Sequence, residues 1–261
     1  MNAITAAVEF EWLKLRRATV TWVASAVLVL VVPLLAAGFL AAGRSDSASQ
    51  LALKARAMVT DTGWSGQFMV TGQILSVAVL IVVGIVASWA FGREFTDRTI
   101  GGLLSLPTSR VQLASAKFLV VTGWAILTCA AAAITTVIAG LATGTGGIGP
   151  QDWAVLGKMF LAALLTIALT APLALAASLG RGYLTGIAIL LSIVVVTQIA
   201  TTAGLGGWFP YAAPGLWLGL GGPEAAAEVT GVQLLLPVPV GAAAVTESLL
   251  WWNSPAATRD L

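Results

Sequence analysis

The chain has 261 residues, of which 58% are apolar and 9% charged, with a net charge of +2. Soluble domains carry roughly a quarter charged residues, so this composition and its long uncharged runs indicate a membrane protein. The basic residues gather on no single candidate face, which gives no indication of nucleic-acid binding. With no His and one Cys, Cys129, the chain excludes a His-ligated metal site, a zinc cluster and an intrachain disulfide.

Residues 3–17, AITAAVEFEWLKLRR, predict an amphipathic helix on the membrane surface. Apolar side chains recur on one face, at Ile4, Val8, Trp12 and Leu15. Basic residues in the last turn would reach anionic headgroups. Two interpretations remain open: an ordinary N-terminal anchor, or an elbow helix (residues 1–17) that flanks a docking site.

Six apolar runs are long enough to cross a bilayer, which needs about 20 residues in a helix. They are residues 18–42, 69–92, 118–142, 154–179, 183–205 and 232–252. The first run is too long for a signal peptide, and Glu9 and Glu11 precede it. We therefore predict an all-α, polytopic protein with one transmembrane domain over residues 1–261.

Basic residues are distributed unequally between the two sides that six spans define. One side carries both termini and nine of them: Lys14, Arg16, Arg17, Arg93, Arg98, Arg110, Lys117, Arg181 and Arg259. The other carries four: Arg44, Lys54, Arg56 and Lys158. The positive-inside rule then predicts a multi-pass protein of the cytoplasmic membrane with both termini in the cytoplasm.

The largest predicted cytoplasmic loop, residues 93–117, combines charges of both signs with an apolar stretch. Residues 99–106 predict a short helix with Ile100, Leu103, Leu104 and Leu106 on the surface that it would bury. Pro107 ends this helix, and Ser109 with Gln112 forms a capping-box pattern that starts a helix leading into the third span. A hairpin folded back on its own bundle is one interpretation; we favour a docking site for another protein.

The opposite side is built differently. Residues 43–68 contain LALKARAMV, which predicts a short surface helix. Residues 204–231 are rich in Gly, Pro and aromatic residues and carry no charge before Glu224. They predict an interfacial or re-entrant segment, which must pack on protein or line a cavity because lipid-exposed irregular backbone is unstable.

Four polar side chains within the spans are candidates for a role in function. Gln198, Thr201 and Thr202 would line a pathway or bond between helices, and the second is commoner. Glu247 lies about one turn from Trp251, so we favour an interfacial position over a proton carrier. Kinks are expected at four prolines: Pro33, Pro172, Pro237 and Pro239.

Motifs of catalysis and nucleotide binding are missing. The sequence contains no Gly-x-Ser-x-Gly and no Walker pattern GxxxxGK[ST]. We predict neither a catalytic residue nor a cofactor or metal site in this chain, and no ATP binding through a P-loop of its own.

Three stretches resemble the ABC-2 type permease family, the membrane subunits of bacterial ATP-binding cassette exporters. EFEWLKLRR is similar to the family's Glu-x-x-Lys-Leu-x-Arg elbow, and the ending TRDL to its Arg-Asp tail. GREFTDRTIGGLLSLPTSRVQLASAK is similar to its cytoplasmic segment, through Glu94, Thr99, Leu103, Leu104, Pro107, Ser109, Arg110 and Lys117. Arg98 stands where the family usually has Gly.

The resemblance implies a coupling helix in residues 93–117 that docks on a separate cytoplasmic ATPase subunit, which binds ATP and Mg. Its expected docking residues are Glu94, Asp97, Arg98, Thr99, Ile100, Leu103, Leu104, Leu106 and Arg110. It also implies a dimer with a second copy or a similar permease, surrounded by membrane lipid. The exported substrate would be amphipathic or lipid-soluble: an antibiotic, with resistance as the outcome, a toxic peptide or a lipid.

Two other classes of protein stay open. An ATP-independent membrane protein, either a secondary carrier or an assembly scaffold, is the main alternative, although a carrier needs intramembrane charge and only Glu247 supplies it. An intramembrane enzyme is third, since the chain has no His and no paired acids within its spans.

Overall fold

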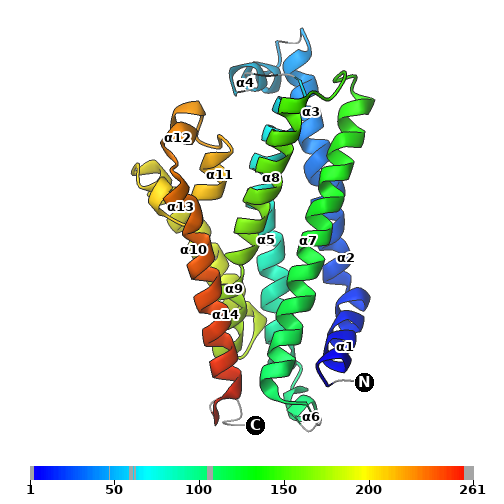
Figure 1. The fold of residues 1–261 in the computed structure, drawn as a ribbon, viewed down its shortest axis with the longest axis vertical. Coiled ribbons are helices and arrows are strands. Elements are labelled where there is room, and N and C mark those ends of the chain that lie inside the picture. The colour runs from blue at the N-terminus through cyan, green and yellow to red at the C-terminus, as the bar shows by residue number, and fades with distance from the viewer. Residues whose placement is uncertain (1–2, 47, 59–60, 62, 105–107, 256–261) are drawn as a thin grey trace.

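The computed structural model describes residues 3–46, 48–58, 61, 63–104 and 108–255. Regular structure in these residues is helical throughout, with no strand. Six segments are long and apolar enough to cross a membrane: Thr19–Arg44, Trp64–Thr96, Arg110–Ala142, Pro150–Leu179, Tyr183–Thr202 and Gly231–Asn253. They stand side by side in one elongated bundle (Figure 1). The predicted all-helical, six-span architecture is confirmed at this level.

The first half of the chain contains α1 (Ala3–Arg17), α2 (Thr19–Ala26), the π-helix η1 (Val27–Val31), α3 (Val32–Arg44), α4 (Gln50–Met58), α5 (Trp64–Thr96), α6 (Ile100–Leu104) and α7 (Arg110–Ala142). The second half contains α8 (Pro150–Ala168), α9 (Ala171–Leu179), α10 (Tyr183–Thr202), the 3-10 helix η2 (Gly206–Trp208), α11 (Ala213–Trp217), α12 (Pro223–Glu228), α13 (Gly231–Leu235) and α14 (Pro237–Asn253).

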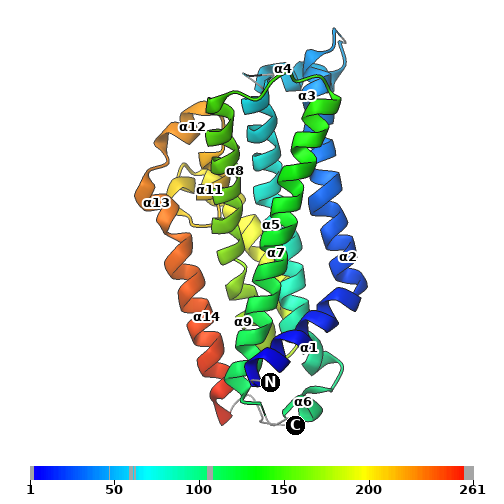
Figure 2. The same ribbon diagram turned by 45° about the vertical axis from the view of Figure 1, so that its right-hand side comes forward.

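The two ends of the bundle differ. Helices α1 and α6 and the last turn of α14 lie at one end, here called the α6 end (Figures 1 and 2). Helix α4 and the connection from α7 to α8 lie at the other, the α4 end (Figure 2). The chain therefore begins and finishes its described part at the same end, as an even number of spans requires.

Helix α5 forms the centre of the bundle. It contacts α3, α7, α8, α9 and α10, and Phe68, Val79, Val83 and Phe91 along it are completely buried. Helix α10 is the opposite case, because only Gly186 and Leu190 of its 20 residues are buried. Several of its other apolar side chains, including Leu184, Leu191 and Ile199, are exposed on the outside of the bundle.

Small residues bring α10 close to α5. A Cβ atom on Gly92 would lie 2.2 Å from the backbone nitrogen of Tyr183, and one on Gly186 would lie 2.4 Å from Oγ of Ser88. No side chain larger than a hydrogen fits at either glycine. Helix packing in membranes relies on such close backbone approach, since no hydrophobic effect drives helices together within lipid.

Proline positions coincide with changes in the helices, as the sequence predicted. Pro33 follows η1, whose wider turns precede α3, and Pro172 lies in the first turn of α9, after α8 has ended at Ala168. Pro237 begins α14 after α13, with Pro239 in the same turn. Proline lacks an N–H and clashes with the preceding turn, which explains each break.

Two helices end at the α6 end with the same capping motif. After α5, Thr99 N–H donates to Glu94 C=O (2.9 Å) and Arg98 N–H to Phe95 C=O (3.2 Å), with Arg98 at a φ of 56°. After α9, Arg181 has a φ of 51° in the equivalent position. These are Schellman motifs, in which the left-handed residue is usually Gly. Arginine at both sites places positive charge against the helix C-terminus, which favours it.

Candidate functional site

The segment between α5 and α7 presents polar groups and bare backbone at the α6 end. Asp97, Arg98 and Thr99 are exposed, and they are followed by Gly101 and Gly102, which are also exposed. A Cβ atom on either glycine would meet nothing within 4 Å. Ile100 is the exception: it is 3% exposed and belongs to the main apolar core. One buried side chain, that of Ile100, thus anchors a short helix in which Gly101 and Gly102 are exposed.

The remaining predicted docking residues are distributed as follows. Leu103 and Leu104 complete the backbone of α6, while Leu106 and Pro107 lie outside the described residues. Arg110 begins α7, and its Nη1 donates to Ser254 C=O (3.4 Å), which connects this helix to the end of α14. The predicted capping box is confirmed: Gln112 N–H donates to Ser109 Oγ at 3.2 Å, and Ser109 N–H to Gln112 Oε1 at 3.1 Å.

Glu94 lies elsewhere than expected. We predicted it on the docking surface, but it is 2% exposed and faces two lysines inside the bundle. It belongs to an ion cluster of two acids and two bases from three helices: Glu11 and Lys14 of α1, Glu94 of α5 and Lys117 of α7. In this conformation its carboxylate is a contact between helices of the same chain.

Lys117 is the centre of the ion cluster. Its Nζ donates to Glu11 Oε2 (3.1 Å), to Glu94 Oε1 (3.0 Å) and to Ala90 C=O (2.9 Å). These three acceptors use all three ammonium protons. Lys14 donates to Glu11 Oε1 at 2.9 Å and also to Glu94 Oε1. Two positive and two negative charges balance, as burial in a medium of low dielectric requires.

The ion cluster determines how α1 sits on the bundle. Its buried stripe is Ala7, Glu11 and Leu15, four residues apart, which brings Glu11 over Lys117. Of the predicted apolar face, Leu15 is buried and Val8 packs on the core, whereas Trp12 is 41% exposed, as a side chain at a membrane surface can be. Apolar spacing alone did not show that Glu11 lies on the buried side of α1, because its partner Lys117 is distant in sequence.

A cavity of about 620 Å³ opens between α1 and α6 beside the ion cluster. Phe10, Lys14, Glu94, Thr99 and Gly102 are among the residues that line it. The second carboxylate oxygen of Glu94, Oε2, is buried and has no hydrogen-bond partner among the described residues. An unpaired buried oxygen is costly, so this corner suits a hydrogen-bond donor from outside the chain or a water molecule.

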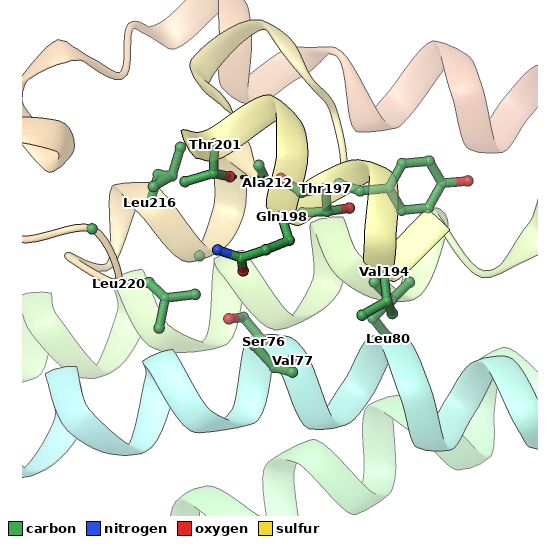
Figure 3. A pocket seen from close by; sticks show the side chains of 13 residues that line it. Ser76, Val77, Leu80, Val194, Thr197, Gln198, Thr201, Ala212, Leu216 and Leu220 are labelled. Carbon is green, nitrogen blue, oxygen red and sulfur yellow. Dashed lines mark hydrogen bonds between the residues drawn. The ribbon is translucent and has the colours of Figure 1, made fainter. Parts of the chain in front are cut away.

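A second candidate site lies between α5, α10 and the segment after α10. Figure 3 shows Gln198 and Thr201 of α10 with Ser76 of α5 around a cavity of about 230 Å³. Residues 204–231 cover it through Tyr211, Ala212 and Leu216. Burial raises the pKa of Tyr211 to about 12, so its phenol is neutral. This segment packs on α5 and α8 through α11, whose Ala213 is completely buried.

Thr202 and Glu247 lie outside this cavity. Thr202 is exposed, and its hydroxyl donates to Gln198 C=O at 2.9 Å. Glu247 is exposed on α14 and forms no ion pair among the described residues. Of the four polar residues predicted along the spans, the structure brings two together.

Sequence reasoning overlooked several of these side chains. Lys117 was recognised only as the last residue of the predicted cytoplasmic loop, directly before the third apolar run, and its partners Glu11 and Glu94 were not identified. Ser76 and Tyr211 carried no signal, since nothing local shows that they face a cavity. No group of three or more His, Cys, Asp or Glu that could hold a metal occurs in the described part of the chain.

The fold and these sites define a class: a polytopic helical membrane subunit with an exposed helical segment between its second and third spans. One protein-family model, described as ABC-2 family transporter protein, matches residues 7–197, and the chain belongs to this family. It is therefore a transmembrane permease subunit without a nucleotide-binding domain, and association with an ATPase subunit is implied. Such subunits carry no cofactor. A search among curated proteins found no match.

Proposed function

We propose that this chain is the permease subunit of an ATP-binding cassette exporter of the cytoplasmic membrane. A separate subunit would hydrolyse ATP, and the permease would move an amphipathic or lipid-soluble molecule, such as an antibiotic, a toxic peptide or a lipid. The observation that carries the proposal is the open α6 segment beside the cavity between α1 and α6. A helix of five residues with two glycines is not stable in isolation, so its exposed surface suits a partner.

The docking surface would consist of the exposed residues around α6. Asp97, Arg98 and Thr99 offer a polar rim, and Gly101 and Gly102 allow the partner's backbone to approach closely. Interfaces commonly combine a buried centre with such a rim. Glu94 would take part from beneath, through its unpaired Oε2 at the base of the cavity.

A charge in α6 tests this docking. Leu103→Asp should abolish association with the ATPase subunit, because an unpaired charge buried at an interface costs several kcal/mol. Leu51→Asp is the matched control: Leu51 is 54% exposed on α4, at the opposite end of the bundle. Co-purification of the ATPase subunit with each variant from membranes is the measurement. If the ATPase subunit co-purifies with Leu103→Asp as well as it does with Leu51→Asp and the wild type, the docking surface lies elsewhere.

A second permease copy, or a similar permease, would complete the pathway. Helices α10 and α14 leave most of their apolar residues outside the core, including Leu191, Ile199 and Leu250. Two such faces suit a permease partner on one side and lipid on the other. Cross-linking in native membranes would detect the dimer.

Coupling to ATP distinguishes this function from a secondary carrier. Glu247 is the ionisable residue on which proton coupling would depend, yet it lies exposed on α14 and outside both cavities described above. Glu247→Gln should therefore retain most transport. Vesicles containing this chain alone should show no uphill transport; uphill movement without an ATPase subunit would favour the carrier.

A further inference from the structure

Two cavities adjoin between α10 and the segment after it. The first, here the Gln198 cavity, has a volume of about 230 Å³, and the second, the Glu228 cavity, about 380 Å³. Thr201, Leu216 and Gly221 line both cavities, so the two meet at these three residues. Together they offer room for an amphipathic small molecule, with an apolar part and a polar part in neighbouring compartments.

Three aliphatic hydroxyl groups of the Gln198 cavity, those of Ser76, Thr197 and Thr201, are acceptors toward a ligand. Ser76 donates its proton to Gln73 C=O (2.9 Å), Thr197 to Ile193 C=O (2.7 Å) and Thr201 to Thr197 C=O (2.8 Å). A hydroxyl has one proton and two lone pairs, so each group has only lone pairs left to offer. The side-chain amide of Gln198 points into the cavity and has no hydrogen-bond partner among the described residues (Figure 3).

Among the residues that line the two cavities, the charged side chain is an acid. Glu228 lines the second cavity, and the chain carries no Lys or Arg between Arg181 and Arg259. Lys158 of α8 approaches this segment, but it packs over the ring of Trp217, 4.8 Å from its centroid, and lines neither cavity. Glu228 is exposed, so solvent screens its carboxylate in part, but its negative charge still favours a cation over an anion at this cavity.

We propose that the two adjoining cavities bind a lipophilic ammonium ion, a molecule with an apolar body and a protonated amine. Leu80, Val194 and Leu216 would contact the apolar body. The ammonium N–H groups would donate to Glu228 and to the oxygens of Gln198 and Thr201. The proposal deepens the proposed function, in that the bound molecule would be the transported one, but binding itself requires neither ATP nor the ATPase subunit.

Three probes with the same rigid apolar cage separate charge from shape: adamantylammonium, adamantanol and adamantanecarboxylate. The full-length protein in nanodiscs of zwitterionic lipid is equilibrated with each probe by dialysis, and empty nanodiscs correct for partitioning into lipid. We expect the ammonium to bind at least tenfold more tightly than the carboxylate, with the neutral alcohol between them.

Matched variants locate the site. Glu228→Gln should lower the affinity for the ammonium to about that of the alcohol and leave the alcohol unaffected. Glu224→Gln is its control, because Glu224 lies one turn away on the same short helix and lines neither cavity. Gln198→Leu should weaken both ammonium and alcohol severalfold, whereas Thr202→Val, four residues along α10 and outside both cavities, should not.

Several outcomes overturn the proposal. One is equal or tighter binding of the carboxylate, and another is no binding of any probe at millimolar concentration. An equal effect of Glu224→Gln and Glu228→Gln would show a diffuse surface effect, which also contradicts a site. These experiments omit ATP and the ATPase subunit, so they are independent of the docking experiment with Leu103→Asp. A failure of ammonium binding would contradict this proposal and not the proposed docking, and the reverse also holds.

Discussion

Arg98 occupies a backbone conformation that residues with a side chain adopt at a cost. At a φ of 56° its Cβ crowds the following carbonyl, which costs about 1–2 kcal/mol for an L-residue. Glycine avoids this cost but loses about 0.5–1 kcal/mol in backbone entropy. Arg98→Gly also removes a favourable charge at the helix C-terminus, so it should raise the free energy of unfolding by up to about 0.5 kcal/mol. The thermal unfolding midpoint of the purified protein measures this.

The control substitutes glycine two residues earlier. Thr96 is the last residue of α5, where glycine costs about 0.3 kcal/mol more than threonine, so Thr96→Gly should lower the midpoint slightly. A lower midpoint for both variants would contradict the capping argument. Arg98→Gly should also test docking. If the variant is stable but associates less with the ATPase subunit, the charge of Arg98 contributes to docking independently of the backbone turn.

Lys117 should be indispensable to stability. Lys117→Met keeps most of the side-chain volume but leaves the carboxylates of Glu11 and Glu94 buried beside one lysine, which costs about 3–5 kcal/mol. Lys158→Met is the matched control, because Lys158 packs on Trp217 and has no ion pair with any residue that the structure describes. In the Lys117→Met background, Glu11→Gln should cost less than in the wild type. The free energies of chemical unfolding of the wild type, Lys117→Met, Glu11→Gln and the double variant form the double-mutant cycle that tests this coupling.

Sequence reasoning identified the members of the ion cluster only as parts of separate motifs. Glu11 and Lys117 are 106 residues apart. The family resemblance placed Glu94 on the docking surface together with Asp97 and Arg98, and only the last two are exposed. Local pattern cannot distinguish a rim charge from a buried one when both follow the same apolar helix. The packing of α1 across α5 and α7 makes that distinction.

At the scale of elements, the close approach of α10 to α5 depends on glycine. A methyl group at Gly92 would meet the backbone of the turn before α10, so Gly92→Ala should destabilise the protein by about 1–3 kcal/mol. Gly123→Ala is the opposite case, because nothing lies within 4 Å of a Cβ there, and it should stabilise α7 by up to about 1 kcal/mol. Thermal midpoints that shift in the same direction for both variants would contradict this account.

Helix existence was predictable from sequence, but helix continuity was not. Long apolar runs gave the six spans, and the Ser109–Gln112 pattern located the start of α7. The break between Ala168 and Ala171 was visible only as Pro172, and the π-turn at Val27–Val31 left no pattern in a uniformly aliphatic run. Composition identified residues 204–231 as irregular, yet their packing through α11 on α5 and α8 depends on contacts distant in sequence.

At the scale of the whole molecule, the distribution of charge predicts which way the bundle sits in the membrane. The α6 end carries the arginines that cap α5 and α9, together with the basic last turn of α1. Because basic residues are retained in the cytoplasm, we expect this end inside the cell. Single cysteines at exposed sites test it: Gly147→Cys and Ala227→Cys toward the α4 end, and Thr99→Cys at the α6 end.

An impermeant thiol reagent should label the first two variants in intact cells and Thr99→Cys only after the membrane is opened. Background should be low, since the native Cys129 is completely buried and burial keeps reagents away. The wild-type protein and each variant in detergent control for reactivity. Labelling of Thr99→Cys in intact cells, with Gly147→Cys protected, would invert the orientation and place α6 out of reach of any cytoplasmic ATPase. The two labelling measurements therefore also test the proposed coupling to ATP, because that coupling requires α6 to face the cytoplasm.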